Sequence, residues 1–548
     1  MDLEIPVGRR KPTYRAFELL PFILSIGMFA LLIGLSLFDP TLGALFLLVV
    51  IISMLVKAVG IAYRTLGGYR VLARASKVDW ADRLAHLEDA STWYSKLHGT
   101  KSHSYNYANH LENLRLISAA EPGYFPKPSQ LYHAVVVATY NEALDVLQPT
   151  IDALVASSKN QRMILVLAYE ERGGVATEET AKKLESMYRS KFYNFILVKH
   201  PDSIQNEVVG KGANCTYAGH FLQQYLDKEG IKYSDVIVTT LDSDNRPHKE
   251  YFDYVSYEYV CHENRKHMSY QPIAMFLSNI WDVPAPMRVI ATGNSFWNII
   301  SSMRPHALRN FAAHSQPMDA LVEMDFWSTR TIVEDGHQYW RSYFYFNGNY
   351  AVEPIHVPVY QDAVMSFTYW KTIKAQFVQL RRWGYGASDV PYVATRVLSK
   401  KRSVPLFDGI AKLWRLIDSH VTLASVAPIV AFGGWAPLLI NPGATRSVVA
   451  LQLPVMVSWI QRIAMVGLFI TILLAVRTLP KRPAHYRKAR TAMMVFQWIL
   501  MPVTSIVFNS AASLTAQFRL FVGAYMEKFD VTDKATYASA MLARKKKR

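Results

Sequence analysis

The chain has 548 residues, which is too long for one ordinary domain and predicts two or more structural units. Lysine and arginine outnumber aspartate and glutamate by 60 to 43, so the formal net charge is +17. This excess is compatible with nucleic acid, an anionic membrane surface or an anionic substrate as a partner. The hydropathy pattern excludes nucleic acid in favour of the membrane.

Five apolar runs are about long enough to cross a bilayer, for which a helix needs roughly 20 residues. They cover residues 19–38, 41–63, 421–440, 448–476 and 491–518. Helices buried in a soluble protein are rarely apolar over such lengths, so the chain is predicted to be a multi-pass membrane protein. Cys215 and Cys261 fall in the part predicted to be cytoplasmic, so no disulfide framework is implied.

Basic residues predict the orientation, because lysine and arginine collect on the cytoplasmic side. They cluster in segments 9–15, 64–77, 400–402, 477–490 and 544–548, whereas the loop 441–447 contains only Arg446. The first two runs should therefore form a hairpin with both ends inside. Five simple crossings would leave the basic tail outside, so the last run either crosses and returns or breaks at Pro502 and re-enters.

Residues 64–130 are mixed and polar, and they are predicted to form a cytoplasmic helical region. The region contains His98, His103 and His110. Their spacing matches no standard zinc-ligand pattern, so packing between helices is favoured over a metal site.

From residue 133 onward, short β-branched runs alternate with helical stretches. The predicted strands cover residues 133–138, 163–168, 195–198 and 236–241. This alternation predicts a mostly parallel sheet with right-handed crossovers. Polar groups follow several of these strands, on the edge where parallel sheets bind ligands.

The strand 236–241 leads directly into Asp242 and Asp244. Two carboxylates at a strand end can hold a hard cation such as Mg²⁺, which fills its other positions with water and substrate phosphates. Acids at such positions also cap helices or form turns, so the pattern alone leaves both interpretations open.

Residues 210–214, G-K-G-A-N, open a predicted helix. Glycines there let backbone amides approach a phosphate, and Lys211 adds a positive charge. A tight turn with a surface lysine is the alternative.

Two further motifs lie downstream. Glu334 and Asp335 begin a predicted helix, where acids also favour the helix dipole. Gln379, Arg382 and Trp383 share one face of a later helix, because they are spaced i, i+3 and i+4. That face could grip a phosphate and a sugar, and it could also lie on lipid headgroups.

In order and spacing, these segments resemble the family-2 glycosyltransferases, and within them the membrane-embedded branch that includes cellulose and hyaluronan synthases. The matching segments are T-Y-N-E (139–142), E-E (170–171), G-K-G-A-N (210–214), D-S-D (242–244), G-N-S (293–295), E-D (334–335), Q-L-R-R-W (379–383) and F-D-V-T-D-K (529–534). Glu170-Glu171 replaces the usual Asp-Asp, and Val333 replaces the usual Thr of T-E-D. These departures leave the general chemistry standing and the identity of the sugar open.

The resemblance implies an α/β nucleotide-diphospho-sugar transferase fold, a mostly parallel Rossmann-like sheet inserted between transmembrane helices. The implied units are a cytoplasmic tail (1–16), a transmembrane hairpin (17–63), a helical linker (64–130), a cytoplasmic glycosyltransferase domain (131–370), interfacial amphipathic helices (371–418), a C-terminal transmembrane region (419–518) and a basic cytoplasmic tail (519–548).

The resemblance also implies a role for each motif. Asp335 is the implied general base, with Glu334 beside it, and Asp244 with Asp242 holds Mg²⁺ or Mn²⁺. The implied donor-binding residues are Thr139, Tyr140, Glu142, Glu170, Glu171, Lys211, Asp242, Gln379 and Arg382, and the implied acceptor-binding residues are Gly293, Asn294, Ser295 and Trp383.

The predicted function is inverting transfer of a sugar from a nucleoside diphosphate sugar, such as a UDP-sugar, to a growing polysaccharide or glycan at the cytoplasmic membrane face. The alternative is transfer of one sugar to a lipid or lipid-linked acceptor. A non-catalytic transporter or scaffold is disfavoured, because the D-S-D, E-D and Q-x-x-R-W motifs are all intact.

Overall fold

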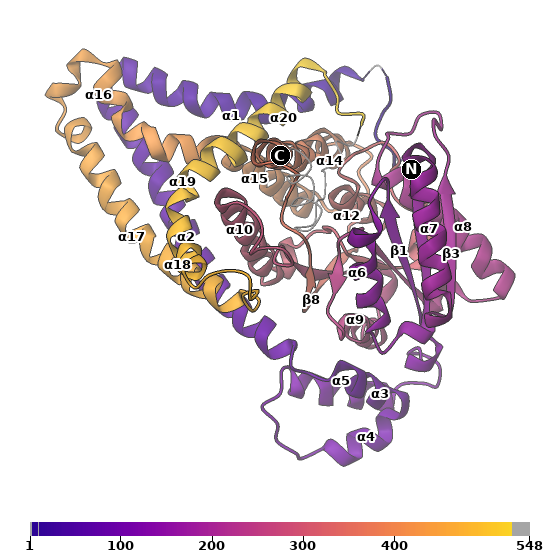
Figure 1. The fold of residues 1–548 in the computed structure, drawn as a ribbon. Coiled ribbons are helices and arrows are strands. Elements are labelled where there is room, and N and C mark those ends of the chain that lie inside the picture. The colour runs from indigo at the N-terminus through magenta and orange to yellow at the C-terminus, as the bar shows by residue number, and fades with distance from the viewer. Residues whose placement is uncertain (1–2, 9, 529–548) are drawn as a thin grey trace.

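The computed structural model describes residues 3–8 and 10–528. A sheet-bearing unit sits beside a group of long helices, and a small helical lobe packs below it (Figure 1). The predicted F-D-V-T-D-K segment (529–534) and the basic tail (544–548) lie outside the described residues.

Within the described residues, eight strands form one mixed sheet in the order β3-β2-β1-β4-β7-β6-β8-β5. The strands are β1 (Tyr132–Thr139), β2 (Met163–Glu170), β3 (Asn194–His200), β4 (Val236–Asp242), β5 (Arg246–Pro247), β6 (Met268–Met275), β7 (Ser315–Pro317) and β8 (Ala351–Tyr360). Only the short strands β5 and β7 run antiparallel to their neighbours. The predicted fold class, a mostly parallel sheet joined to long apolar helices, is confirmed.

Alternating residues of the central strands face two separate hydrophobic cores, as the period of a strand requires. Val135, Val137 and Leu165 face one core, while Val136 and Ile164 face the other. Helices α6 (Leu144–Val155), α7 (Gly174–Tyr188) and α9 (Tyr251–Cys261) cover the first face, and α8 (Lys211–Glu229) and α11 (Met318–Glu323) cover the second. Because both faces are covered, the strands read as continuous apolar runs.

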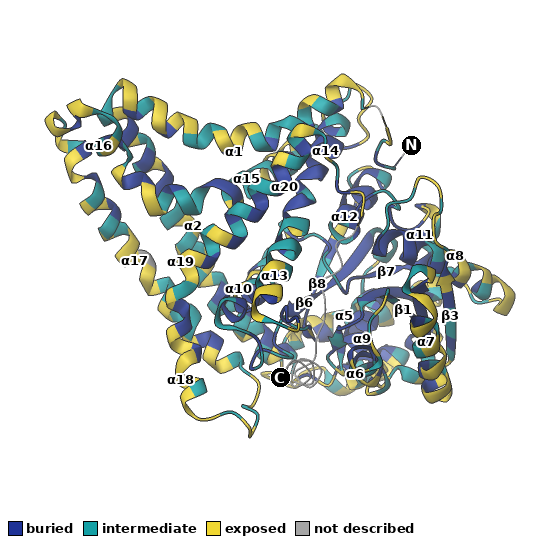
Figure 2. Cartoon of the chain, turned by 45° about the horizontal axis from the view of Figure 1, so that its top comes forward, coloured by how far each residue is buried: buried dark blue, intermediate teal, exposed yellow. Residues whose placement is uncertain are grey.

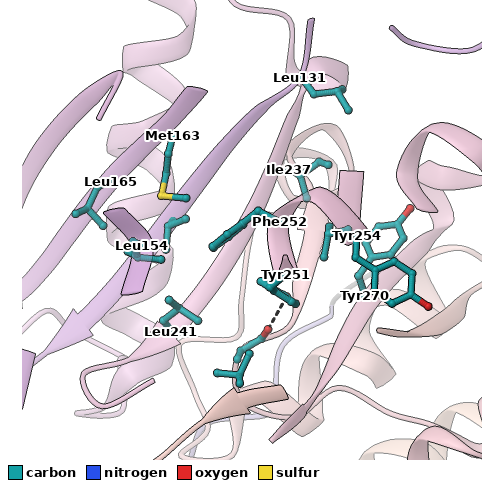
Figure 3. Close-up of a cluster of buried hydrophobic side chains, with 14 of the residues drawn as sticks. Leu131, Leu154, Met163, Leu165, Ile237, Leu241, Tyr251, Phe252, Tyr254 and Tyr270 are labelled. Carbon is teal, nitrogen blue, oxygen red and sulfur yellow. Dashed lines mark hydrogen bonds between the residues drawn. The ribbon is translucent and has the colours of Figure 1, made fainter. Parts of the chain in front are cut away.

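Aromatic side chains of α9 anchor it to the sheet. Tyr251, Phe252 and Tyr254 lie among Ile237 and Leu241 of β4, as Figure 3 shows. The Tyr251 hydroxyl donates a hydrogen bond to the Ala313 carbonyl at 2.9 Å, so this buried hydroxyl has a partner.

The lobe formed by α3 (Trp80–His86), α4 (Ala90–Leu97) and α5 (Tyr107–Ala119) packs on α9. Trp80 stacks on Tyr254 with 3.5 Å between ring centroids. His110 is buried, and its Nδ1 lies 3.0 Å from the Tyr257 hydroxyl. His98 and His103 are exposed, so the three histidines predicted to be packing residues do not gather into a metal site.

Five helical segments of the described chain are long and apolar enough to cross a membrane. They are α1 (Pro12–Phe38), α2 (Pro40–Ala75), Leu406–Ile440, which comprises α15 (Leu406–Phe432) and α16 (Ala436–Ile440), α17 (Val448–Thr478), and Ala489–Val522, which comprises α18 (Ala489–Phe496), α19 (Met501–Thr504) and α20 (Ala511–Val522). Many residues of α1, α2 and α17 are exposed (Figure 2), and the exposed residues of these helices include large apolar side chains. Exposed apolar surface on this scale suits contact with lipid.

Contacts at the ends of the first four segments show which of their connecting loops lie together. The Asn441 side chain donates to the carbonyls of Ser36 and Leu37 at 3.0 Å, so the loop 441–447 lies beside the turn between α1 and α2. At the opposite end, the Trp281 indole donates to the Pro480 carbonyl at 3.0 Å, so the segment after α17 lies on the sheet-bearing unit.

The last segment does not turn back as a hairpin. It begins where the Arg490 guanidinium donates to the Trp281 carbonyl at 2.8 Å. It ends where the Arg15 guanidinium donates to the Leu520 carbonyl at 2.6 Å, beside the first turn of α1 (Figure 1). Both ends therefore lie on the side of the sheet-bearing unit. Pro502 and a π-helical stretch at Ser505–Ser510 bend the segment along its course.

Three more helices join the sheet to the long helices. They are α10 (Ala285–Ser302), α13 (Tyr369–Gly384) and α14 (Asp389–Val397). Helix α10 packs between β6 and α2, and α13 packs on α20. The remaining helix, α12 (Glu334–Tyr345), begins at the candidate site.

Candidate active site

The carboxyl ends of four parallel strands meet at one edge of the sheet. Ala138 of β1 pairs in register with Asp242 of β4, and Glu170 of β2 pairs with His200 of β3. The predicted polar residues that follow these strands are therefore neighbours in space, at the edge where parallel sheets bind their ligands.

A buried lysine holds three carboxylates together at this edge. The Lys211 ammonium nitrogen lies 2.9 Å from Asp242 Oδ1 and 3.2 Å from both carboxylate oxygens of Asp335. It also lies 3.9 Å from Glu334 Oε1. These residues come from the end of β4, the start of α8 and the start of α12, so three predicted motifs converge. Lys211, predicted to contact a diphosphate, here contacts carboxylates.

Glycine at position 212 allows this convergence. A Cβ atom there would lie 2.5 Å from the Ser328 carbonyl oxygen and 2.9 Å from the Glu334 Cβ. Contacts that short do not occur, so any larger residue would push α8 away from α12. The second glycine of the G-K-G motif thus serves a close approach within the protein.

Burial and charge act in opposite directions on the ionisable groups of this cluster. Burial acts to lower the pKa of Lys211, but Asp242, Asp335 and Glu334 outweigh it and raise that pKa well above its usual value. Burial and the neighbouring Asp335 charge raise the pKa of Glu334 to about 8. Glu334 is therefore largely protonated at neutral pH, while Lys211 remains charged.

Glu142 organises the turn that follows β1. Its Oε2 accepts hydrogen bonds from the Thr139 hydroxyl at 2.7 Å and from the Tyr140 backbone N–H at 2.8 Å. Its Oε1 accepts from the Ser243 hydroxyl at 3.1 Å. The T-Y-N-E turn is thereby tied to the D-S-D turn on the neighbouring strand.

The paired glutamates after β2 have separate environments. Glu170 is buried and pairs with Arg172, whose guanidinium lies 4.0 Å from the centre of the Tyr140 ring. Glu171 is exposed and lies 3.1 Å from Lys199 Nζ. Glu170 thus borders the T-Y-N-E turn, and Glu171 points to the outside of the edge.

Asp244 is buried beside the end of β8. Its Oδ2 accepts a hydrogen bond from the Asp362 backbone N–H at 3.2 Å, and the Asp362 carboxylate lies 3.3 Å from Arg246. Asp242 and Asp244 offer only oxygen donors, which is the donor set that Mg²⁺ and Mn²⁺ prefer. The residues present fit such an ion.

The predicted acceptor residues are linked through Phe276, which follows β6. The Phe276 backbone N–H donates to the Ser295 hydroxyl at 2.9 Å, and its ring centre lies 5.9 Å from that of Trp383. Ser295 is buried and also donates to the Ala291 carbonyl, so its hydroxyl serves helix α10. Gly293 is exposed on the same helix, and Asn294 is half-buried.

Helix α13 carries the other predicted ligands. The Gln379 side-chain oxygen accepts a hydrogen bond from Gln376 at 3.1 Å, and Arg382 is half-buried. Trp383 is 38 % exposed and Trp370, at the start of the helix, is 77 % exposed. Leu380 of this helix shares a hydrophobic core with Ile273 and Met275 of β6, and the helix also packs on α20, so its two predicted roles, ligand binding and membrane contact, are compatible.

Sequence reasoning missed His314. This buried histidine ends the segment before β7, and its Nδ1 lies 3.7 Å from Asp335 Oδ1. The Trp327 indole N–H points to Nε2 at 3.4 Å, which leaves Nδ1 to donate to the Phe311 carbonyl at 2.9 Å. Burial lowers the pKa of His314, so a neutral ring faces the carboxylate cluster. No sequence motif identifies His314, because the neighbouring strand β7 has only three residues and shows no recognisable pattern.

No protein-family model and no curated protein sequence matches the chain. Among solved structures, the chain is similar to a mannosyltransferase from Pyrobaculum calidifontis in complex with GDP-mannose and Mn²⁺, at 14 % identity and a TM-score of 0.40, over 80 % of this chain and 100 % of the other. It is also similar to S. aureus TarS, at 10 % identity and a TM-score of 0.29, over 71 % of this chain and 55 % of the other. Similarity this low does not establish a shared activity.

Proposed function

We propose that the protein is a membrane glycosyltransferase that transfers a sugar from a nucleoside diphosphate sugar, such as a UDP-sugar, to a glycan acceptor. The observation that carries the proposal is the cluster of Lys211, Asp242 and Asp335 at the carboxyl edge of the sheet. Through Lys211, the cluster brings Asp242, which is suited to bind a nucleotide sugar, close to Asp335, whose carboxylate is suited to accept a proton. The proposed class, family-2-like and inverting, also rests on the motif resemblance.

The donor would lie along the strand ends. Tyr140, Glu170 and Asp242 border the proposed nucleotide position, and Thr139 and Glu142 hold its shape. A Mg²⁺ or Mn²⁺ ion on Asp244 and Asp242 would neutralise charge on the leaving diphosphate. Arg382 on α13 is the proposed protein cation for that diphosphate.

Asp335 is the proposed general base. The acceptor hydroxyl gives its proton to the Asp335 carboxylate as its oxygen bonds to the anomeric carbon, and the bond from that carbon to the diphosphate oxygen breaks. Attack opposite the leaving group inverts the anomeric centre. The Lys211 ammonium group lies 3.2 Å from both Asp335 oxygens and orients the carboxylate before the reaction. General-base catalysis is typically worth about 10²–10⁴-fold in rate.

The acceptor is proposed to approach along Trp383 and the exposed part of α10. An exposed aromatic ring can stack on the terminal sugar of a bound chain, which favours a polymerising enzyme. Transfer of one sugar to a lipid-linked acceptor is the second candidate, favoured by the position of α13 between the sheet and the long helices.

The decisive experiment uses the full-length protein purified in detergent. UDP- and GDP-sugars are screened with Mg²⁺ or Mn²⁺ for nucleoside diphosphate release, and the product is then sized. A polymer supports the first candidate, and a single sugar on a lipid under excess donor supports the second. Failure of every donor, in protein shown to be folded, contradicts the proposal of a glycosyltransferase.

A further inference from the structure

A cavity of about 260 Å³ lies away from the carboxylate cluster, between α12, the start of β8 and the first turns of α15. Its polar lining comes from His306, Asp408, Lys412 and Arg415, and its apolar lining includes Tyr339 and Tyr350. None of these residues belongs to the site proposed above for sugar transfer. The cavity is therefore a separate feature of the molecule.

Positive charge around this cavity is not balanced by acids. Asp408 is already engaged, because it lies 2.5 Å from Lys412 and accepts a hydrogen bond from the Tyr343 hydroxyl at 2.6 Å. Within the described part of the chain, Arg415 and Arg304 have no ion-pair partner. The cavity thus presents at least one unpaired guanidinium directly.

The mutual repulsion of these cations contributes to lowered pKa values at Arg304 and His306. Burial, followed by the charges of Arg64 and Arg415, lowers the pKa of Arg304. Burial, followed by Arg415, Arg304, Arg64 and Lys412, lowers the pKa of His306. The four charged groups with the largest effect on His306 are all cations, so an anion bound here would relieve the repulsion.

The cavity lies where two long helices leave the membrane. The apolar run 41–63 of α2 contains one charged residue, Lys57, and Arg64 follows the run directly. The segment Leu406–Ile440 has 35 residues and would be about 50 Å long as a helix, so its first turns extend beyond a hydrocarbon core of about 30 Å. Phe407 and Trp414, which are 87 % and 69 % exposed, flank the cavity residues on α15. Exposed aromatic side chains at this depth are typical of the headgroup region.

We propose that this cavity binds the phosphate of an anionic membrane lipid headgroup, held by Arg415 and Lys412 of the lining and by Arg304, which directly precedes the lining residues Pro305 and His306. Arginine guanidinium groups match the geometry of phosphate oxygens. A headgroup with net negative charge is favoured over a zwitterionic one, because a choline group would add positive charge to a cavity that is already positive. The apolar lining accommodates the glycerol portion, and the acyl chains follow the exposed faces of α2 and α15. The site goes beyond sugar transfer, since it would couple the sheet-bearing unit to the composition of the surrounding lipid.

The test measures binding of a fluorescent phosphatidylglycerol and of a phosphatidylcholine with the same acyl chains to the full chain in an uncharged detergent. We expect saturable binding of phosphatidylglycerol, and at least tenfold weaker binding of phosphatidylcholine. In the double variant Arg304→Gln/Arg415→Gln, binding of phosphatidylglycerol should weaken by about tenfold or more, since each cation near an anionic lipid contributes on the order of 1 kcal/mol.

The matched control is Lys401→Gln/Arg402→Gln, which removes the same charge from an exposed loop outside the cavity. It should change the binding constant by less than about twofold. Equal binding of both lipids, or equal loss in both double variants, overturns the proposal. Displacement of phosphatidylglycerol by equal concentrations of inorganic phosphate also overturns it, because the ligand would then be a soluble phosphate. If the double variant does not fold, the exposed Arg415→Gln alone serves the same comparison.

Discussion

At the scale of single residues, Lys211 decides the chemistry of the candidate site. It is buried, charged and in contact with carboxylates from two other elements. A buried ammonium is costly unless it is paired, and removing its partners leaves an uncompensated charge. The consequence is a cluster in which Asp335 is paired with Lys211, while Glu334 is largely protonated at neutral pH.

The proposed role of Asp335 as general base predicts that its substitution affects kcat far more than donor affinity. Asp335→Asn should lower kcat by about 10²-fold or more, because the general base is lost, while donor affinity changes by only a few-fold. Steady-state kinetics and donor titration measure the two quantities separately. Parallel loss of donor affinity would make Asp335 a structural cap of α12 instead.

A second prediction concerns Glu334 and pH. The folded pKa of about 8 lies above the unfolded value of 4.5, so the native state holds a proton that the unfolded state has lost between these values. This group therefore makes the protein less stable as pH rises from about 4.5 to about 8. Glu334→Gln, which mimics the protonated form, should unfold at a higher temperature than the wild type at pH 8, and the difference should shrink towards pH 5.

The measurement is thermal unfolding in detergent at one scan rate across that pH range. The control is Glu229→Gln, an exposed residue at the end of α8. A destabilised Glu334→Gln at pH 8, with the control unchanged, would mean that the ionised form of Glu334 supports the fold.

At the scale of elements, two helix starts must come together for the site to exist. Gly212 makes this possible, because its lack of a side chain lets α8 approach the start of α12 and the loop before it. Gly212→Ala should lower turnover by at least about tenfold and reduce stability by about 1–3 kcal/mol, as overpacking does. Gly34→Ala is the matched control, since no atom lies within 4 Å of a Cβ there. Wild-type turnover in Gly212→Ala would mean that the spacing of α8 and α12 does not limit the reaction.

The exposed Trp383 ring on helix α13 leads to a prediction about how the acceptor is retained. Trp383→Ala should shorten the product or abolish elongation, while release of nucleoside diphosphate stays detectable, because the ring acts on the acceptor and not on the donor. Trp370→Ala, on the same helix and more exposed, should leave product length unchanged. Product sizing by gel filtration distinguishes the two variants. Unchanged product length in Trp383→Ala removes the argument for stacking.

At the scale of the whole molecule, contacts at the ends of the long helices group the connecting loops at two separate places. The loop 441–447 contacts the turn between α1 and α2, whereas the segment after α17 contacts the sheet-bearing unit. Both ends of Ala489–Val522 also lie on that unit's side. This arrangement reconciles the last apolar run with a basic tail predicted to be inside.

The corresponding prediction uses single cysteines at positions 443, 485 and 527, in a background with Cys215 and Cys261 replaced by alanine. In sealed vesicles, positions 485 and 527 should label from one side, and 443 from the other. Labelling of 527 together with 443 would mean that Ala489–Val522 crosses the membrane.

The sequence by itself determined the first four strands, the order of the motifs along the chain and the long helices, but not the strands β5–β8. β-Branched runs and apolar stretches of bilayer length are local signals, and they reappear as β1–β4 and as the five long helical segments. The sheet edge was predictable for the same reason, since consecutive parallel strands end on one side. The individual roles of the site residues remain predictions.

Only the tertiary structure decided which groups meet. Lys211 could be assigned to a phosphate from its motif, but its carboxylate partners come from segments far along the chain, and no local pattern encodes that contact. His314 was missed because a strand of three residues carries no periodicity. The course of Ala489–Val522 was left open, because hydropathy measures burial from water and does not distinguish a helix that crosses the membrane from one that lies along the protein.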